Sequence, residues 1–135
     1  MIFVDTGFLL ALSQPGDALY ARAKGWASIV TEPLVVTEYI LWETVNRLSQ
    51  PVDRPKAHGL VSYIRSATNY ELVVASPALF DAGLRLHAER HDKEWSLTDC
   101  ITFAVMHERR IGRALAYDRH FEQAGFEALL RRDPP

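Results

Sequence analysis

Four acidic side chains lie in four separate segments of the chain, and each follows or lies within an apolar stretch. A carboxylate at the edge of a buried element costs stability unless another group pairs with it. Four carboxylates brought together would repel one another and raise their own pKa values. A divalent cation removes that repulsion, and the resulting site could hydrolyse phosphodiester bonds. The candidate catalytic and metal-binding residues are Asp5, Glu43, Asp99 and Asp118.

The types of ligand indicate which metal such a cluster would suit. Mg²⁺ and Mn²⁺ prefer oxygen ligands, and Mg²⁺ keeps several of its waters, whereas zinc prefers histidine or cysteine. His87 and His91 stand four positions apart, but the order His-Ala-Glu-Arg-His is not the His-Glu-x-x-His pattern of metalloproteases. We therefore interpret both histidines as surface or structural residues and expect Mg²⁺ or Mn²⁺ as the cofactor.

Each acidic residue also has an ordinary structural interpretation. Asp5 and Asp118 could simply end a strand, because aspartate is common in turns. Asp99 fits a helix start, three residues after Ser96 as the N-cap. Glu43 could lie on a solvated helix face, although the helix around it is apolar over a wide arc. The metal-site hypothesis therefore depends on all four carboxylates meeting at one place, and if they repel there, Asp99→Asn should stabilise the metal-free protein.

The composition is that of an ordinary globular domain. The chain has 135 residues, 48% of them hydrophobic, and a formal net charge of −2. This length predicts a single domain over residues 1–135 with a core of its own. Free-standing DNA-binding modules usually carry a marked basic excess. Its absence argues against nucleic-acid affinity as the main task, but it does not exclude a nuclease whose acids are concentrated in one cleft.

The sequence contains no pattern for export, membrane insertion or disulfide formation. Its apolar stretches are much shorter than a membrane span, and the N-terminus lacks the charged start and cleavage site of a signal peptide. The single cysteine, Cys100, excludes an internal disulfide and is expected to be inert and buried. We therefore expect a cytoplasmic protein without membrane contact.

Apolar runs and helical spacings alternate along the chain, which predicts an α/β fold with a mostly parallel sheet and helices on both faces. Thr6-Gly7 is expected to turn the chain after the first strand. In such sheets the ligand site lies beyond the C-terminal ends of the strands, where Asp5 and Asp118 are both expected. The pattern predicts strands at 2–4, 28–31, 71–75, 113–117 and 127–130, helices at 17–26, 33–48, 56–67, 78–90 and 96–109, and a short turn or helix at 121–125.

Four segments together resemble the PIN-domain family, in particular the VapC-like toxins of bacterial toxin–antitoxin pairs. The resemblance extends from residue 1 to about residue 126, and the order and spacing of its Ser-Leu-Thr-Asp and Asp-Arg-His-Phe motifs make it fairly specific. The segments are Phe-Val-Asp-Thr-Gly at 3–7, Glu-Thr-Val-Asn at 43–46, Trp-Ser-Leu-Thr-Asp-Cys at 95–100 with Phe-Ala-Val-Met at 103–106, and Ala-Tyr-Asp-Arg-His-Phe at 116–121.

The resemblance implies a PIN-like three-layer α/β/α fold with about five strands, and a metal-dependent endoribonuclease whose acidic residues are the four named above. It implies that Thr6 and Thr98 hydrogen-bond the carboxylates or a water on the metal. It also implies a homodimer, inhibited by a small antitoxin protein that inserts into the cleft. The motifs say nothing about which RNA is cut.

The expected reaction is hydrolysis of an RNA phosphodiester. Asp5 and Asp99 would hold the first Mg²⁺ directly, with Glu43 and Asp118 completing its surroundings, partly through water. In-line attack by water would leave a 3′-hydroxyl and a 5′-phosphate.

Four basic residues are weaker candidates for phosphate contacts, and we interpret them as surface residues. Two other functions stay open: a catalytically silent binding or regulatory module of the same fold, and a DNA nuclease of the same fold. The four basic residues are Arg22, Lys93, Arg119 and His120.

Overall fold

The computed structural model describes residues 1–135 and contains one central sheet of five strands in the order β3-β2-β1-β4-β5. All four strand pairings are parallel. This confirms the predicted α/β class and the mostly parallel sheet. The strands are β1 (Ile2–Val4), β2 (Leu34–Thr37), β3 (Tyr70–Val73), β4 (Arg113–Leu115) and β5 (Glu127–Ala128).

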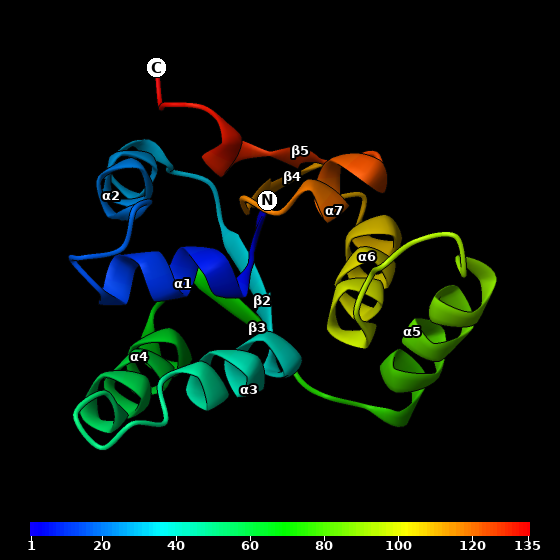
Figure 1. Cartoon of the computed structure of the whole chain (residues 1–135), viewed down its shortest axis with the longest axis horizontal. Coiled ribbons are helices and arrows are strands. Elements are labelled where there is room, and N and C mark those ends of the chain that lie inside the picture. The colour runs from blue at the N-terminus through cyan, green and yellow to red at the C-terminus, as the bar shows by residue number, and fades with distance from the viewer.

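Helices cover both faces of the sheet, as the three-layer prediction requires. In Figure 1, α1, α2 and α4 lie on one side of the central strands, and α6 lies on the other side with α5 outside it. No helix is both long and apolar enough to cross a membrane. The helices are α1 (Thr6–Ser13), α2 (Tyr20–Ile29), α3 (Glu38–Arg47), α4 (Arg54–Ser66), α5 (Pro77–Glu89), α6 (Leu97–Arg109) and α7 (Arg119–Gln123), with a 3₁₀ turn η1 (Leu129–Arg131).

The second strand lies later in the chain than predicted. The predicted strand at 28–31 is wrong, because its first residues complete α2, and the predicted helix at 33–48 begins only at Glu38. The segment Leu34–Thr37 is buried along its whole length and pairs with both β1 and β3. Apolar β-branched residues suit such a doubly covered strand. Thr37 then caps α3, its Oγ1 accepting a hydrogen bond from the amide of Ile40 at 3.1 Å.

The chain does not turn at Thr6-Gly7 as predicted, because α1 begins at Thr6 immediately after Asp5. Helix α1 has no polar face, so its sequence shows no helical alternation of polar and apolar residues. Phe8 and Leu9 are fully buried. A short helix that is apolar on most sides lacks the amphipathic pattern on which sequence-based prediction depends. Because α1 begins immediately after β1, Asp5 lies between the end of the strand and the start of the helix.

The other predicted elements agree with the structure to within a few residues. The last two strands are shorter than predicted. Strand β4 ends at Leu115 rather than at residue 117, and β5 at Ala128 is followed by η1. Cys100 is buried and free, as expected. Because β4 ends early, Ala116 and Tyr117 form a short connection that leads directly to Asp118.

An aromatic cluster beside the sheet connects α6 to α7. The ring of Phe103 lies edge-on to Trp95 at 5.0 Å and to Phe121 at 5.2 Å, and it also packs on Phe126 at 5.6 Å. Edge-to-face pairs at these separations are favourable beyond the area that they bury. The cluster therefore fixes the N-terminal end of α6, where Asp99 lies, relative to α7.

Candidate active site

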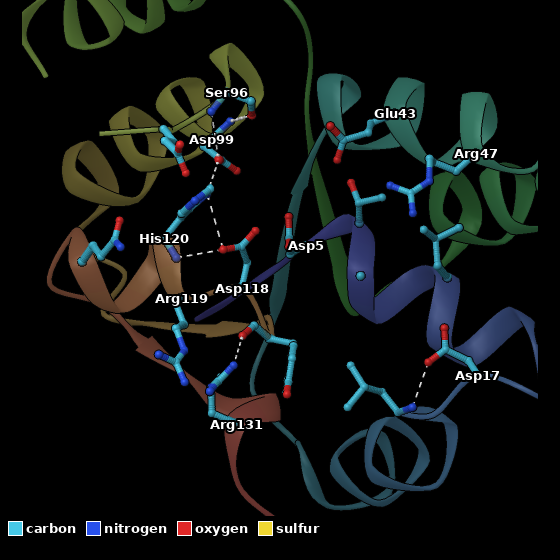
Figure 2. Close-up of a pocket in the computed structure, with 17 residues that line it drawn as sticks. Asp5, Asp17, Glu43, Arg47, Ser96, Asp99, Asp118, Arg119, His120 and Arg131 are labelled. Carbon is cyan, nitrogen blue, oxygen red and sulfur yellow. Dashed lines mark hydrogen bonds and ion pairs between the residues drawn. The ribbon is translucent and has the colours of Figure 1, made fainter. Parts of the chain in front are cut away.

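The four predicted acidic residues come from four different elements and line one open cavity of about 790 Å³. Asp5 follows β1 and Asp118 follows the connection after β4, so both lie beyond the C-terminal ends of neighbouring parallel strands. Asp99 lies in the first turn of α6, and Glu43 lies on α3. In Figure 2, the side chains of the other three surround that of Asp5.

The surroundings of Asp5 shift its pKa strongly. Its pKa is raised from 3.8 to about 7, first by burial and then by the charges of Asp99, Glu43 and Asp118, while the amide of Thr6 lowers it in part. Asp5 is the N-cap residue of α1, but its carboxylate makes no capping hydrogen bond. The carboxylate is therefore directed into the cavity and lacks the usual compensation for a buried charge.

Asp99 has both a structural and a site-facing contact. The amide of Ser96 donates to Asp99 Oδ2 at 3.1 Å, and the amide of Asp99 donates to Ser96 Oγ at 3.0 Å. This is the predicted capping box, which holds the first turn of α6 in place. The same Oδ2 lies 2.9 Å from Nδ1 of His120. The structural and chemical interpretations of Asp99 are thus both compatible with the structure.

His120 is part of the acidic cluster, so its interpretation as a surface residue is wrong. Its Nδ1 lies 2.9 Å from Asp99 and 3.4 Å from Asp118 Oδ1, as the dashed lines in Figure 2 show. Its backbone amide also donates to Asp118 Oδ1 at 2.9 Å, which caps α7. The only sequence signal was its position two residues after Asp118, at the start of a short helix. That position does not reveal a partner 21 residues away.

The other three basic candidates separate into two groups. Arg119 is an exposed surface residue, as interpreted from the sequence, and it lines the acidic cavity. Arg22 instead pairs with Asp133 at 2.9 Å, and Lys93 lies 3.8 Å from Asp92. Neither of these two lines the cavity, which agrees with the surface interpretation.

The two threonines expected beside the carboxylates occupy different places. Thr6 lines the cavity, and its buried Oγ1 has no hydrogen-bond partner. Thr98 does not line the cavity but a neighbouring groove between α3, α5 and α6. Successive residues on a helix point about 100° apart, so a helix that directs Asp99 into the cavity turns Thr98 away from it. Glu43 lines the same groove as Thr98, so the predicted role of Thr98 beside the carboxylates stays a prediction.

The residues fit a hard divalent cation by their chemistry. The donor set consists of carboxylate oxygens, and an orphaned buried hydroxyl on Thr6 is available to a water or a carboxylate beside them. As the side chains stand, no three histidine, cysteine or acidic groups converge closely enough to hold an ion. A cation bound there would therefore be held partly through water or after a small movement of the carboxylates, and it would reduce the repulsion between Asp5 and its acidic neighbours.

Arginines border the cavity on two sides. Figure 2 shows Arg47 on one side of the carboxylates and Arg119 with Arg131 on the other. Arg47 and Arg119 form no salt bridge with any acidic residue. Unpaired guanidinium groups are suited to bind phosphate oxygens. Carboxylates beyond the ends of parallel strands, bordered by such cations, fit the chemistry of a nuclease that cuts phosphodiester bonds.

Comparison with known proteins identifies the family. Residues 2–127 match the PIN domain family model. The chain is 34% identical over 128 residues to the 23S rRNA-specific endonuclease VapC20 of Mycobacterium tuberculosis, covering 93% of this chain and 95% of that protein. A crystal structure of VapC20 from the same organism, described as a toxin that cleaves the sarcin–ricin loop, matches with a TM-score of 0.84 and 31% identity, over 93% of this chain and 96% of that one. The chain belongs to the PIN-domain family and is VapC-like, which confirms the resemblance seen in the sequence.

Proposed function

We propose that the protein is an endoribonuclease toxin that hydrolyses RNA phosphodiester bonds with the help of Mg²⁺ or Mn²⁺. The observation that carries the proposal is that four carboxylates from separate elements line one cavity, with Glu43, Asp99 and Asp118 around Asp5. Similarity to an RNA endonuclease along nearly the whole chain supports RNA rather than DNA as the substrate.

The chain's own residues have distinct tasks in this proposal. Asp5 and Asp99 would bind the cation directly, and Glu43 and Asp118 would complete its surroundings, partly through water. When bound, the cation polarises a water and offsets the negative charge that develops on the phosphate. The orphaned Oγ1 of Thr6 would orient a water or the Asp5 carboxylate. Attack by water in line with the leaving oxygen leaves a 3′-hydroxyl and a 5′-phosphate.

The first substrate to test is the sarcin–ricin loop of 23S ribosomal RNA. The relative that matches nearly the whole chain and shares its fold is described as cutting this loop. None of the four acidic residues selects a base, so the choice of RNA depends on the surfaces that border the cavity. A ribosomal substrate would place the action of this protein in the cytoplasm.

The purified protein is expected to cut an RNA that contains this loop when Mg²⁺ or Mn²⁺ is present, and to lose that activity in EDTA. Asp99→Asn should lower the rate by about 10²-fold or more, the order expected when one electrostatic group is removed from a transition-state site. Asp81→Asn is the matched control, because Asp81 is exposed on α5 and does not line the cavity.

Two outcomes would replace this proposal with its alternatives. Cleavage of DNA of the same sequence at a rate equal to that of RNA would favour a DNA nuclease of this fold. Absence of cleavage together with absence of metal binding in a calorimetric titration would favour a catalytically silent binding module.

The proposed homodimer would use the apolar groove beside the cavity. Trp42 is 68% exposed and Phe80 43% exposed, and both line a groove of about 300 Å³ that also contacts Glu43. Large exposed aromatic side chains that line one groove are typical of a protein contact. Light scattering is expected to give twice the monomer mass, and Trp42→Glu to give the monomer. A monomeric wild-type protein at micromolar concentration would remove the dimer from the proposal.

The antitoxin part of the proposal follows from the charge of the cavity. A cluster of four carboxylates would attract a basic side chain of a small partner protein inserted into it. We expect a short reading frame for a DNA-binding antitoxin beside the gene, and we expect its product to co-purify with this protein and to inhibit RNA cleavage. A co-expressed product that neither binds nor inhibits would exclude it as the antitoxin.

A further inference from the structure

An aromatic side chain lies at the rim of the acidic cavity, directly before one of the four carboxylates in the chain. Tyr117 lies between the end of β4 and Asp118, and it is 42% exposed. It lines the same cavity as the carboxylates. Consecutive Cα atoms are about 3.8 Å apart. Any phosphodiester that reaches Asp118 therefore brings its flanking nucleotide within reach of this ring.

Arg131, which ends η1, is held against Tyr117. Its guanidinium carbon lies 4.4 Å from the centre of the tyrosine ring. Its Nη1 donates to the carbonyl oxygen of Tyr117 at 3.2 Å, and its Nε lies 3.8 Å from Glu122. The backbone contact and the carboxylate contact together restrain the guanidinium. The pair is thus ordered before any ligand arrives, which lowers the entropy that a ligand must lose on binding.

The chemistry of this pair suits a nucleobase. Unstacked bases of single-stranded RNA bind on the faces of aromatic rings and on the planes of arginine guanidinium groups. The backbone of the same nucleotide carries a phosphate, and the unpaired Arg119 lies on the same side of the cavity as Arg131 in Figure 2. A base surface and a phosphate-binding cation therefore lie together beside the carboxylates.

We propose that Tyr117 and Arg131 form a stacking site for the nucleobase that flanks the bond to be cut. This inference rests on the proposed RNA cleavage and assigns a subsite to it. Stacking tolerates different bases, because every base has a flat face. The subsite therefore increases affinity for an unpaired nucleotide at the cleavage point and orients its backbone, and it does not select one base by hydrogen bonds.

A purely structural role for the pair makes a different prediction. If Tyr117 and Arg131 only fasten η1 to the end of β4, their replacement changes the stability of the protein and leaves RNA binding unaltered. A stacking role instead changes the KM for RNA and the spectroscopic signal of the stacked base. The test therefore needs a measurement on the RNA as well as one on the protein.

The experiment uses a single-stranded oligoribonucleotide of the cleaved sequence, with 2-aminopurine beside the bond that is cut. Mixing with wild-type protein is expected to quench the 2-aminopurine fluorescence. Tyr117→Leu should remove most of the quenching and raise KM by about 5- to 100-fold, the range that corresponds to the loss of one base–aromatic stack. Tyr117→Phe keeps the ring and should retain both the quenching and most of the affinity. Tyr63→Leu, at an exposed tyrosine of α4 outside the cavity, is the control.

The outcomes separate this inference from the proposed function. Wild-type cleavage with an unchanged KM and unchanged quenching in Tyr117→Leu would overturn the stacking site alone. A loss in Tyr117→Phe as large as that in Tyr117→Leu would also overturn it, because the hydroxyl rather than the ring would be responsible. Absence of RNA cleavage by the wild-type protein would instead overturn the proposed function and, with it, this subsite.

Discussion

Asp5→Asn is expected to abolish RNA cleavage and, at the same time, to stabilise the metal-free protein near neutral pH. The pKa of Asp5 is about 7 in the folded protein and 3.8 without its surroundings, mainly because of burial and then because of three neighbouring carboxylates. Between these two values the folded state holds a proton that the unfolded state has lost. Stability from this group therefore falls as the pH rises from about 4 to about 7.

The size of this change in stability follows from the shift in the pKa of Asp5. A rise of about three pKa units corresponds to a cost on the order of 4 kcal/mol once Asp5 is ionised above pH 7. Asparagine at this position carries no charge, so the variant should lose this pH-dependent cost. The difference in free energy of unfolding between the variant and the wild type should be small near pH 4 and should grow in favour of the variant up to about pH 7.

The measurement is urea denaturation in EDTA at pH values from 4 to 8, with Asp81→Asn as the control. The difference in free energy of unfolding between Asp5→Asn and the wild type should change with pH. If it does not, the pKa of Asp5 is not raised by its surroundings in the folded protein. Addition of Mg²⁺ should stabilise the wild type more than the variant, because a cation binds to the ionised group. Catalysis should fall in Asp5→Asn at every pH.

Asp5 is a better choice for this test than Asp99, for which the sequence predicted the same stabilisation. The carboxylate of Asp99 accepts a hydrogen bond from the amide of Ser96 and lies 2.9 Å from His120. Replacing Asp99 therefore weakens the capping box of α6 and the contact with His120, and this loss offsets the relief of repulsion. The carboxylate of Asp5 makes no capping hydrogen bond, and the amide of Thr6 offsets its pKa rise only in part.

Phe103→Ala is expected to cost about 3–5 kcal/mol of stability, the range for removal of a large buried aromatic side chain. Phe103 is fully buried and lies at the centre of the cluster formed with Trp95, Phe121 and Phe126. Because the cluster joins α6 to α7, the variant that remains folded at low temperature should also cleave RNA more slowly. Urea denaturation and single-turnover cleavage at low temperature measure the two effects.

Val52→Ala provides the comparison for this substitution. Val52 is highly exposed in the loop before α4, so truncation there should change stability by no more than about 0.5 kcal/mol. Phe103→Leu should be less harmful than Phe103→Ala, because it leaves a smaller cavity. Equal stabilities for Phe103→Ala and Val52→Ala would show that the aromatic cluster does not hold α6 and α7 together.

Local sequence patterns predicted most elements because their signals lie within a few residues. Strand β1 is a continuous apolar run, and α6 starts at a capping box that the sequence shows directly. The misplaced β2 and the missed α1 have a common cause. Both segments are apolar at nearly every position, and a continuous apolar run lacks the periodicity that distinguishes a helix from a strand.

The amino-acid sequence alone determined the kinds of group at the site and the elements that carry them. Asp5 and Asp118 follow strands, and parallel strands end at a common edge, so their meeting was predictable from topology. The sequence also contained the family motifs that the comparison confirms.

The tertiary structure alone decided how these groups interact. The burial that raises the pKa of Asp5, the place of His120 between two carboxylates, and the contact of Arg131 with Tyr117 all depend on segments that are distant in the chain. Distances of a few ångströms between such segments result from the packing of the whole core, and no local pattern encodes them. For the same reason Thr98, adjacent to Asp99 in sequence, lies in a different groove.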